Sequence, residues 1–319
     1  MRRGRYDDYY DEVYGRTPPR RRRKKRGRGF LLLLVLLLAL GALYMVRSGG
    51  LRVLSVPQEN IETDFEVDLE ALAARITPDM AGADGLGAAE AQELLAAAEE
   101  AHGERADMLA FMAENIGIYS EEAYKTALVT PEKTAFALLT PFMSEQSEAS
   151  AYISLTPGEI PYLLQYDSRW AYHVYGSSYM GYTACGPTCL SMAALALTGN
   201  SAYTPPYVAD WAEANGHYVP GAGTAWTLFT SGAAAFGLNG QAISAGRTDL
   251  AERLERGEII VASMLPGDFT TSGHFILIVS SEALGFRVYD PNSMALSRRY
   301  WTYDDLAPQI AQLWSITAA

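Results

Sequence analysis

Cysteine and histidine are scarce in this chain, which has two cysteines and four histidines among 319 residues. The cysteines, Cys185 and Cys189, are too few and too close together for a disulfide framework. No other cysteine or histidine follows them at the spacing of metal ligands. The sequence therefore predicts neither a metal site nor a cofactor.

Positive charge is scarce beyond residue 29, where thirteen Lys and Arg stand against thirty-three Asp and Glu, a net charge of −20. The first 29 residues have the opposite balance, with twelve basic and four acidic side chains and a net charge of +8. We interpret residues 1–29 as a disordered basic tail. An acidic portion of this size repels polyanions, so we expect no nucleic-acid partner.

Long apolar runs are limited to residues 30–46, whose 17 residues are at the short end of what spans a bilayer as a helix. Eight of the nine residues from 20 to 28 are basic, which favours a cytoplasmic N-terminus. The sequence thus predicts a signal-anchor helix in the cell membrane, crossing once, with the bulk of the chain extracytoplasmic. A cleaved signal peptide is the alternative, since Ala39, Gly41 and Ala42 are small residues.

Residues 47–157 are interpreted as a linker followed by a helical accessory segment. Ser120, followed by two glutamates, is typical of a helix start. Thr130, Pro131 and Glu132 combine an N-cap, a proline and an acid, which predicts another start. No catalytic cluster is evident here, so we take the segment for a spacer or accessory module.

Residues 158–319 form a second domain in which helical patterns precede strand patterns. Helices are predicted at residues 185–198, 208–214, 224–236 and 248–257, and strands at residues 259–262, 273–279 and 285–290. Seven of the 21 residues from 162 to 182 are aromatic, which indicates packing around a long loop or the lining of a peptide cleft. Helices followed by antiparallel strands predict an α+β domain.

Cys185 lies where a loop runs into the first of these helices. Pro187 suits the first helical position, and Leu190 and Leu197 continue the helical spacing. The unpaired N–H groups and the positive dipole end of a helix start stabilise negative charge, which suits a nucleophile. The alternative for a free cysteine is a small buried apolar residue, and that is our interpretation of Cys189.

The last two predicted strands bring a histidine toward a carboxylate. A hairpin that turns at residues 281–284 pairs residues whose numbers sum to about 564 or 565. His274 then lies opposite Asp290 or its neighbour, where a carboxylate would orient the imidazole. His173 and His217 have no carboxylate placed beside them by an evident element.

Residues 158–319 resemble the papain-like cysteine peptidases related to the bacteriocin-processing C39 family, in their stand-alone C39-like form. The resemblance covers about half of the chain and rests on an ordered set of motifs: Leu164-Gln165-Tyr166-Asp167-Ser168-Arg169-Trp170, Ala184-Cys185-Gly186-Pro187-Thr188-Cys189, Gly273-His274-Phe275 and Tyr289-Asp290-Pro291. It implies Cys185 as nucleophile, His274 as general base and acid, Asp290 as the residue that orients His274, and Gln165 as oxyanion donor.

Two features depart from the bacteriocin-processing members. Their Gln lies a handful of residues before the cysteine, whereas 20 positions separate Gln165 from Cys185 here. Those members are fused to transporter domains, which nothing here resembles, so their double-glycine leader specificity is not carried over. Asn292 is a fallback for Asp290, because papain uses Asn in that role.

The sequence therefore predicts a membrane-anchored extracytoplasmic cysteine peptidase that acts on a peptide or protein. Three alternatives stay open. The first is a cell-wall peptide amidase or transpeptidase with the same triad, and the second is a non-catalytic module that binds peptides. The third is a membrane-tethered structural protein, for which the helical middle segment is the supporting feature.

Overall fold

The computed structural model describes residues 60–319 apart from residues 83, 145–151 and 245. The described residues all belong to one of the chain's two units, Val53–Ala319. The predicted tail of residues 1–29 and the predicted span of residues 30–46 lie outside the described residues. Within the part described, no helix has the length and apolar character needed to cross a bilayer.

A six-stranded antiparallel sheet organises the C-terminal domain, with the strand order β5-β10-β6-β7-β8-β9. Its strands are β5 (Leu238–Ile243), β6 (Ile259–Met264), β7 (His274–Glu282), β8 (Gly285–Tyr289), β9 (Tyr300–Trp301) and β10 (Ile310–Ala318). The predicted α+β order, helices first and an antiparallel sheet after, is confirmed.

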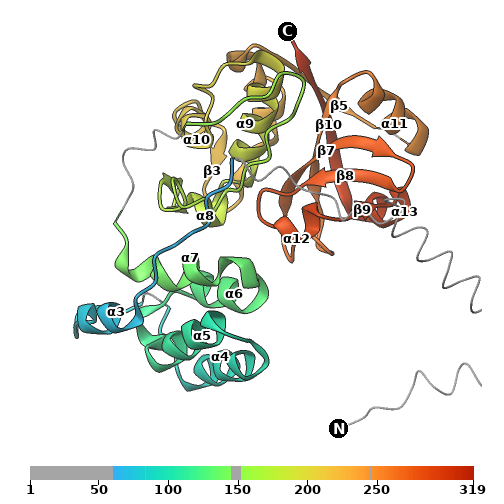
Figure 1. The fold of residues 1–319 in the computed structure, drawn as a ribbon. Helices are drawn as coiled ribbons and strands as arrows, with labels where there is room; N and C mark the ends of the chain where they lie inside the picture. Colours follow the sequence, from blue (N-terminus) through green and yellow to red (C-terminus); the bar gives the residue numbers. More distant parts are fainter. Residues whose placement is uncertain (1–59, 83, 145–151, 245) are drawn as a thin grey trace, which may run out of the picture. The chain divides into compact units, whose positions relative to one another are not determined.

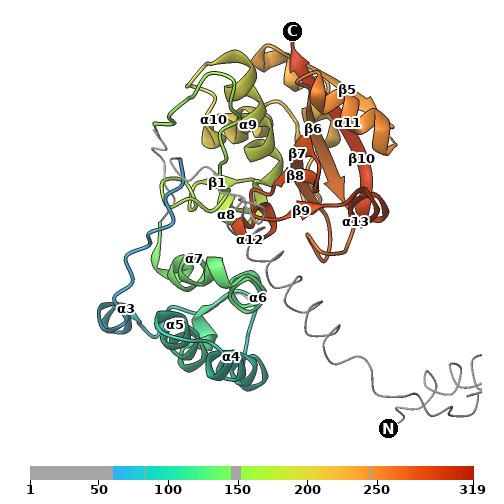
Figure 2. The same cartoon turned by 45° about the vertical axis from the view of Figure 1, so that its right-hand side comes forward.

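Both faces of the sheet are buried, which is why its central strands read as continuous apolar runs. Val261 and Leu277 belong to the core shared with α9, whereas Ile260 and Ile278 belong to the core shared with α11. Helices α9 (Cys185–Thr198) and α10 (Pro205–Ala214) lie on one side of the sheet and α11 (Arg247–Glu255) on the other (Figures 1 and 2).

Short elements complete this domain. They are β1 (Val174–Tyr175), β2 (Ser178–Tyr179), α8 (Met180–Thr183), β3 (Tyr218–Val219), β4 (Gly223–Thr224), η4 (Trp226–Phe229), η5 (Ala233–Phe236), α12 (Met294–Ser297), α13 (Tyr303–Leu306) and η6 (Ala307–Gln309). The aromatic stretch of residues 162–182 serves mainly for packing, since Tyr162, Tyr166, Trp170, Tyr172 and Tyr175 are at most 1% exposed.

One helix predicted for this domain was wrong, and strands of the sheet were not predicted. The single helix predicted at residues 224–236 is two 3-10 turns, because the chain leaves helical geometry at Thr230, with φ −123° and ψ −91°. Gly237 does end the second turn, at φ 71°. Strands β5 and β10 were missed, although β10 pairs with β6 at the centre of the sheet.

The helical segment before residue 145 consists of α3 (Leu69–Arg75), α4 (Ala88–Glu100), α5 (Glu104–Glu114), η1 (Ile116–Ile118), α6 (Glu121–Val129), η2 (Pro131–Lys133), α7 (Thr134–Leu139) and η3 (Thr140–Phe142). Ser120 caps α6 as predicted, since its Oγ accepts from the N–H of Ala123 at 3.2 Å. Thr130 and Pro131 begin a 3-10 turn that leads directly into α7.

The helical segment shares one hydrophobic core with the C-terminal domain. Phe136 of α7 is fully buried, and its ring centroid lies 5.1 Å from that of Tyr172 and 4.7 Å from that of Tyr182. A Cβ added to Gly181 would meet the Phe136 ring at 2.2 Å, so this contact requires a glycine. The segment is therefore packed against the chain just before Cys185.

We expect Gly181→Ala to destabilise the fold by about 1–3 kcal/mol, because the new methyl group must displace the Phe136 ring. The midpoint and slope of urea unfolding measure this loss. Gly117→Ala is the matched control, since a Cβ there meets nothing within 4 Å, and it should change stability by less than about 0.5 kcal/mol. Equal effects of the two substitutions would contradict the packing described.

Candidate active site

Cys185 is the first residue of α9 and is partly exposed, as the sequence predicted for a thiol at a helix start. The helix begins two residues before Pro187, so this proline lies within its first turn. Gly186 brings the β3–β4 hairpin close, because a Cβ there would meet the Thr224 side chain at 2.6 Å. The hairpin thus contacts the residue that follows Cys185.

His274 and Asp290 are in direct contact, with the Nε2–H of the imidazole donating to Oδ1 of the carboxylate at 2.6 Å. The hairpin register differs from the predicted one, because paired residue numbers sum to 567 near the turn, as in Glu282 with Gly285, and to 566 past a bulge, as in Leu277 with Tyr289. Asp290 thus follows β8 two positions away from a direct pairing with His274. An offset of two keeps both side chains on the same side of the sheet, so the predicted contact survives.

Electrostatics at His274 favour the imidazolium. Burial alone lowers the pKa of His274, but the charges of Asp290 and Cys185, together with hydrogen bonds to both side chains, outweigh it and raise the pKa to about 10. Since Nε2 contacts Asp290, Nδ1 is the ring nitrogen left to interact with the Cys185 thiol. His274 is therefore influenced by a carboxylate and by a thiol.

Asp290 is fully buried and held on several sides. Its backbone N–H donates to Ser297 Oγ at 2.8 Å, and its carbonyl accepts from the Tyr162 hydroxyl at 2.7 Å. The backbone N–H of Asn292 donates to Oδ1 at 2.7 Å. Asn292, the fallback for Asp290, instead turns its side-chain oxygen toward Lys133. Asp290 is thus the carboxylate partner of His274.

Gln165 is 1% exposed, and its Nε2 donates to the carbonyl of Gly181 at 2.9 Å. Its backbone N–H donates to the carbonyl of Pro291 at 2.8 Å, which ties it to the loop that follows Asp290. The reversed amide would set two acceptors against each other, so the hydrogen-bond chemistry fixes Nε2 toward Gly181. One of the two Nε2 hydrogens is used in this contact, and the amide has a second to offer.

The motif around Gln165 is shaped by a buried ion pair. Arg169 binds Asp167 through two contacts, Nε to Oδ1 at 2.7 Å and Nη2 to Oδ2 at 2.8 Å. The indole N–H of Trp170 donates to the carbonyl of Leu164 at 2.9 Å. These contacts close the turn that follows Gln165, which accounts for the residue types of this motif.

Lys133 was missed by the sequence analysis. It lies in η2, is 3% exposed, and its Nζ donates to the Gly181 carbonyl at 2.7 Å and to Asn292 Oδ1 at 2.8 Å. A lysine that follows a proline and a glutamate resembles an ordinary exposed helix start. No local signal in the sequence could have identified it.

The other cysteine and two other histidines considered from the sequence have partners of their own away from Cys185, His274 and Asp290. Cys189 is fully buried, burial raises its pKa, and its Sγ contacts the Phe275 carbonyl at 3.4 Å. His173 has a carboxylate partner after all, since its Nε2 lies 2.6 Å from Asp210 Oδ1. This partner was not predicted because Asp210 belongs to α10, which only tertiary packing brings close to His173. His217 stacks on an indole ring and pairs with a hydroxyl.

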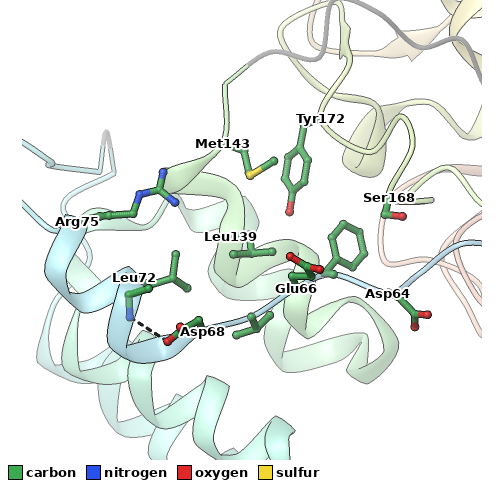
Figure 3. A pocket seen from close by; sticks show the side chains of 12 residues that line it. Asp64, Glu66, Asp68, Leu72, Arg75, Leu139, Met143, Ser168 and Tyr172 are labelled. Carbon is green, nitrogen blue, oxygen red and sulfur yellow. Dashed lines mark hydrogen bonds between the residues drawn. The ribbon is translucent and has the colours of Figure 1, made fainter.

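A cavity of about 620 Å³ lies elsewhere (Figure 3). It is lined by Asp64, Phe65, Glu66, Val67, Asp68, Ala71, Leu72, Arg75, Leu139, Met143, Ser168 and Tyr172, and none of Gln165, Cys185, His274 and Asp290 is among them. Among the described residues, no cluster of three or more His, Cys, Asp or Glu side chains could hold a metal ion.

Asp290→Asn should lower the pKa of His274 well below 10, because the charge that offsets burial is removed. Titration of the imidazole C–H resonances by NMR measures this shift. The raised pKa also links to stability: the contribution is complete below about pH 6.5 and is lost as the pH rises through about 10. An unchanged midpoint in Asp290→Asn would contradict the electrostatic role of this carboxylate.

Comparison with protein families finds a match over residues 158–318, to the Peptidase_C39 like family. The matched region begins near Glu159 and contains Gln165, Cys185, His274 and Asp290, but it excludes Lys133. No curated protein matches this chain. This chain belongs to the Peptidase_C39-like family and is a cysteine peptidase.

Proposed function

We propose that this chain hydrolyses peptide bonds with Cys185 as nucleophile, His274 as general base and acid, and Asp290 as the residue that orients the imidazole. The observation that carries the proposal is the contact of the His274 imidazole with the buried Asp290 carboxylate at 2.6 Å, and the charge and hydrogen bonding of Cys185 also act on that imidazole. A nucleophile, a base and a group that orients the base are the parts that covalent catalysis requires.

In the first half-reaction, His274 takes the proton of the Cys185 thiol, and the thiolate Sγ attacks the carbonyl carbon of the scissile peptide bond. The negative charge moves to the carbonyl oxygen, for which the backbone N–H of Cys185 and the second Nε2 hydrogen of Gln165 are the proposed donors. His274 gives its proton to the leaving nitrogen, the C–N bond breaks, and a thioester remains on Cys185.

In the second half-reaction, His274 takes a proton from water and the resulting hydroxide attacks the thioester. The C–S bond breaks, the carboxylic acid product leaves, and the Cys185 thiolate and the His274 imidazolium that begin the cycle are restored. Asp290 stays ionised throughout, because its part is to orient the ring and stabilise the imidazolium. An amine in place of water would give transpeptidation.

We further propose that residues 30–46 anchor the enzyme in the cell membrane and that the catalytic domain is extracytoplasmic. The support is in the sequence: an apolar run of 17 residues directly follows a strongly basic stretch. The substrate would then be an extracytoplasmic peptide or protein, with cell-wall peptide as the second candidate.

Cys185→Ala should abolish hydrolysis, because no other group can form the acyl-enzyme. The measurement is release of peptides from casein, with amine release from peptidoglycan peptides assayed beside it to separate the two substrate classes. Cys189→Ala is the matched control, since its thiol is fully buried, and activity should stay near that of the wild type. Activity that survives in Cys185→Ala would refute the mechanism.

The proposed location predicts that a membrane-impermeant maleimide labels Cys185 on intact cells that express the full chain. The partly exposed thiol should react without lysis, and Cys185→Ala should abolish the labelling. Labelling that occurs only after the cells are lysed would place the domain on the cytoplasmic side and contradict this part of the proposal.

A further inference from the structure

Lys133 carries a charge in a place where charge is costly. Its side chain is almost completely buried, and an ammonium out of water requires partners. Within the described part of the chain, no carboxylate oxygen lies within ion-pair distance of Nζ. Its hydrogen-bond partners are the Gly181 carbonyl and Asn292 Oδ1. Three aromatic rings surround the ammonium, with their centroids 5.5–5.6 Å from Nζ, and they belong to Phe136, Tyr166 and Tyr182.

Both acceptors of Lys133 belong to groups that hold the proposed catalytic residues. The Gly181 carbonyl also accepts from Gln165 Nε2, so two donors converge on one oxygen four residues before Cys185. Asn292 donates its backbone N–H to the same Asp290 oxygen that binds His274. The Lys133 ammonium thus contacts both the carbonyl that holds the Gln165 amide and the residue whose backbone holds the Asp290 carboxylate.

The turn that carries Lys133 is fixed on both sides. Glu132 interacts with Ser293 and with the backbone at the start of α12, in the loop that follows Asp290. Glu122 accepts from Ser178 Oγ at 2.7 Å, in the strand before α8. With Phe136 packed against Gly181, these contacts leave Lys133 little freedom to take another position.

We propose that Lys133 is a positioning residue of the active site, supplied by the helical segment that lies outside the family match. Its ammonium fixes the Gly181 carbonyl and the Asn292 side chain, and through them Gln165 and Asp290. The helical segment is then an integral part of the catalytic unit rather than a spacer. This inference rests on the proposed catalytic roles of Gln165, Cys185, His274 and Asp290.

The charge of Lys133 is sensitive to pH near neutrality. Burial lowers its pKa to about 8, against the opposing influence of Glu122, Asp290, Cys185 and Glu132. The groups that face it are thus carboxylates from α6, from η2 and from the loop after β8, together with the thiol of α9. Since a depressed lysine pKa leaves the ammonium charged only below about pH 8, its contribution should fade as the pH rises through that value.

The test uses the full chain with Lys133→Met, which keeps the length and the apolar contacts but removes the charge and the donors. We expect kcat to fall about 10- to 100-fold with little change in KM, because the substrate-contacting groups remain but lose their alignment. The kcat of the wild type should decline as the pH rises through about 8, and Lys133→Met should lack this alkaline limb of the pH profile. Lys133→Arg, charged at every pH used, should recover part of the activity and also lack the limb.

Lys125→Met is the matched control, because Lys125 is 62% exposed and pairs only with Glu121 on its own helix. It should keep wild-type activity and pH dependence, and thermal unfolding of each variant reports whether the fold is intact. The inference is overturned if folded Lys133→Met matches the wild type in kcat and pH profile. If Lys133→Met does not fold, the wild-type profile decides, and the absence of a limb between about pH 7 and 9 overturns the inference. Activity in Cys185→Ala would instead overturn the proposed function itself, so the two failures are distinguishable.

Discussion

The buried carboxylate of Asp290 is the constraint on which the rest of the site depends. A buried carboxylate needs donors, and here the imidazole of His274 and the backbone N–H of Asn292 both donate to Oδ1, at 2.6 and 2.7 Å, whereas Oδ2 has no hydrogen-bond partner among the described residues. The contact with Asp290 engages Nε2 of His274 and leaves Nδ1 to interact with the Cys185 thiol. The orientation of the base thus depends on its contact with one buried carboxylate.

The fold meets this requirement by joining segments far apart in the sequence. Tyr162 and Ser297 hold the backbone of Asp290, and the loop after it also binds Gln165 and Lys133. Helix α9 supplies the thiol against the face of the sheet that carries Phe275 and Leu277. The helical segment of residues 60–144 contributes Phe136 to the shared core and Lys133 to the Gly181 carbonyl. Catalytic geometry and hydrophobic core are therefore built from the same contacts.

The sequence was sufficient to predict a contact between residues of one hairpin or an element with a regular apolar pattern. A hairpin brings His274 and Asp290 together although the predicted sums of 564 or 565 differ from the observed 566 and 567, because Asp290 lies two positions from a direct pairing with His274 and an even offset preserves the face. It was insufficient where the contact depends on packing between distant segments: Lys133 and Asn292 are 159 positions apart, and Asp210 reaches His173 only through the placement of α10. Strand β10 was missed because it pairs with β5 and β6, which both lie far before it in the sequence. The family match likewise covers Cys185, His274 and Asp290 but not Lys133.

The most direct test of the central claim is the alkylation rate of the two thiols by iodoacetamide in purified wild-type protein and in His274→Ala. If Cys185 is activated by the imidazole, it reacts much faster than the buried Cys189 in the wild type, and His274→Ala removes most of that difference while the fold persists. A Cys185 rate that is unchanged by His274→Ala would contradict the account, because the thiol would then be independent of the histidine and carboxylate.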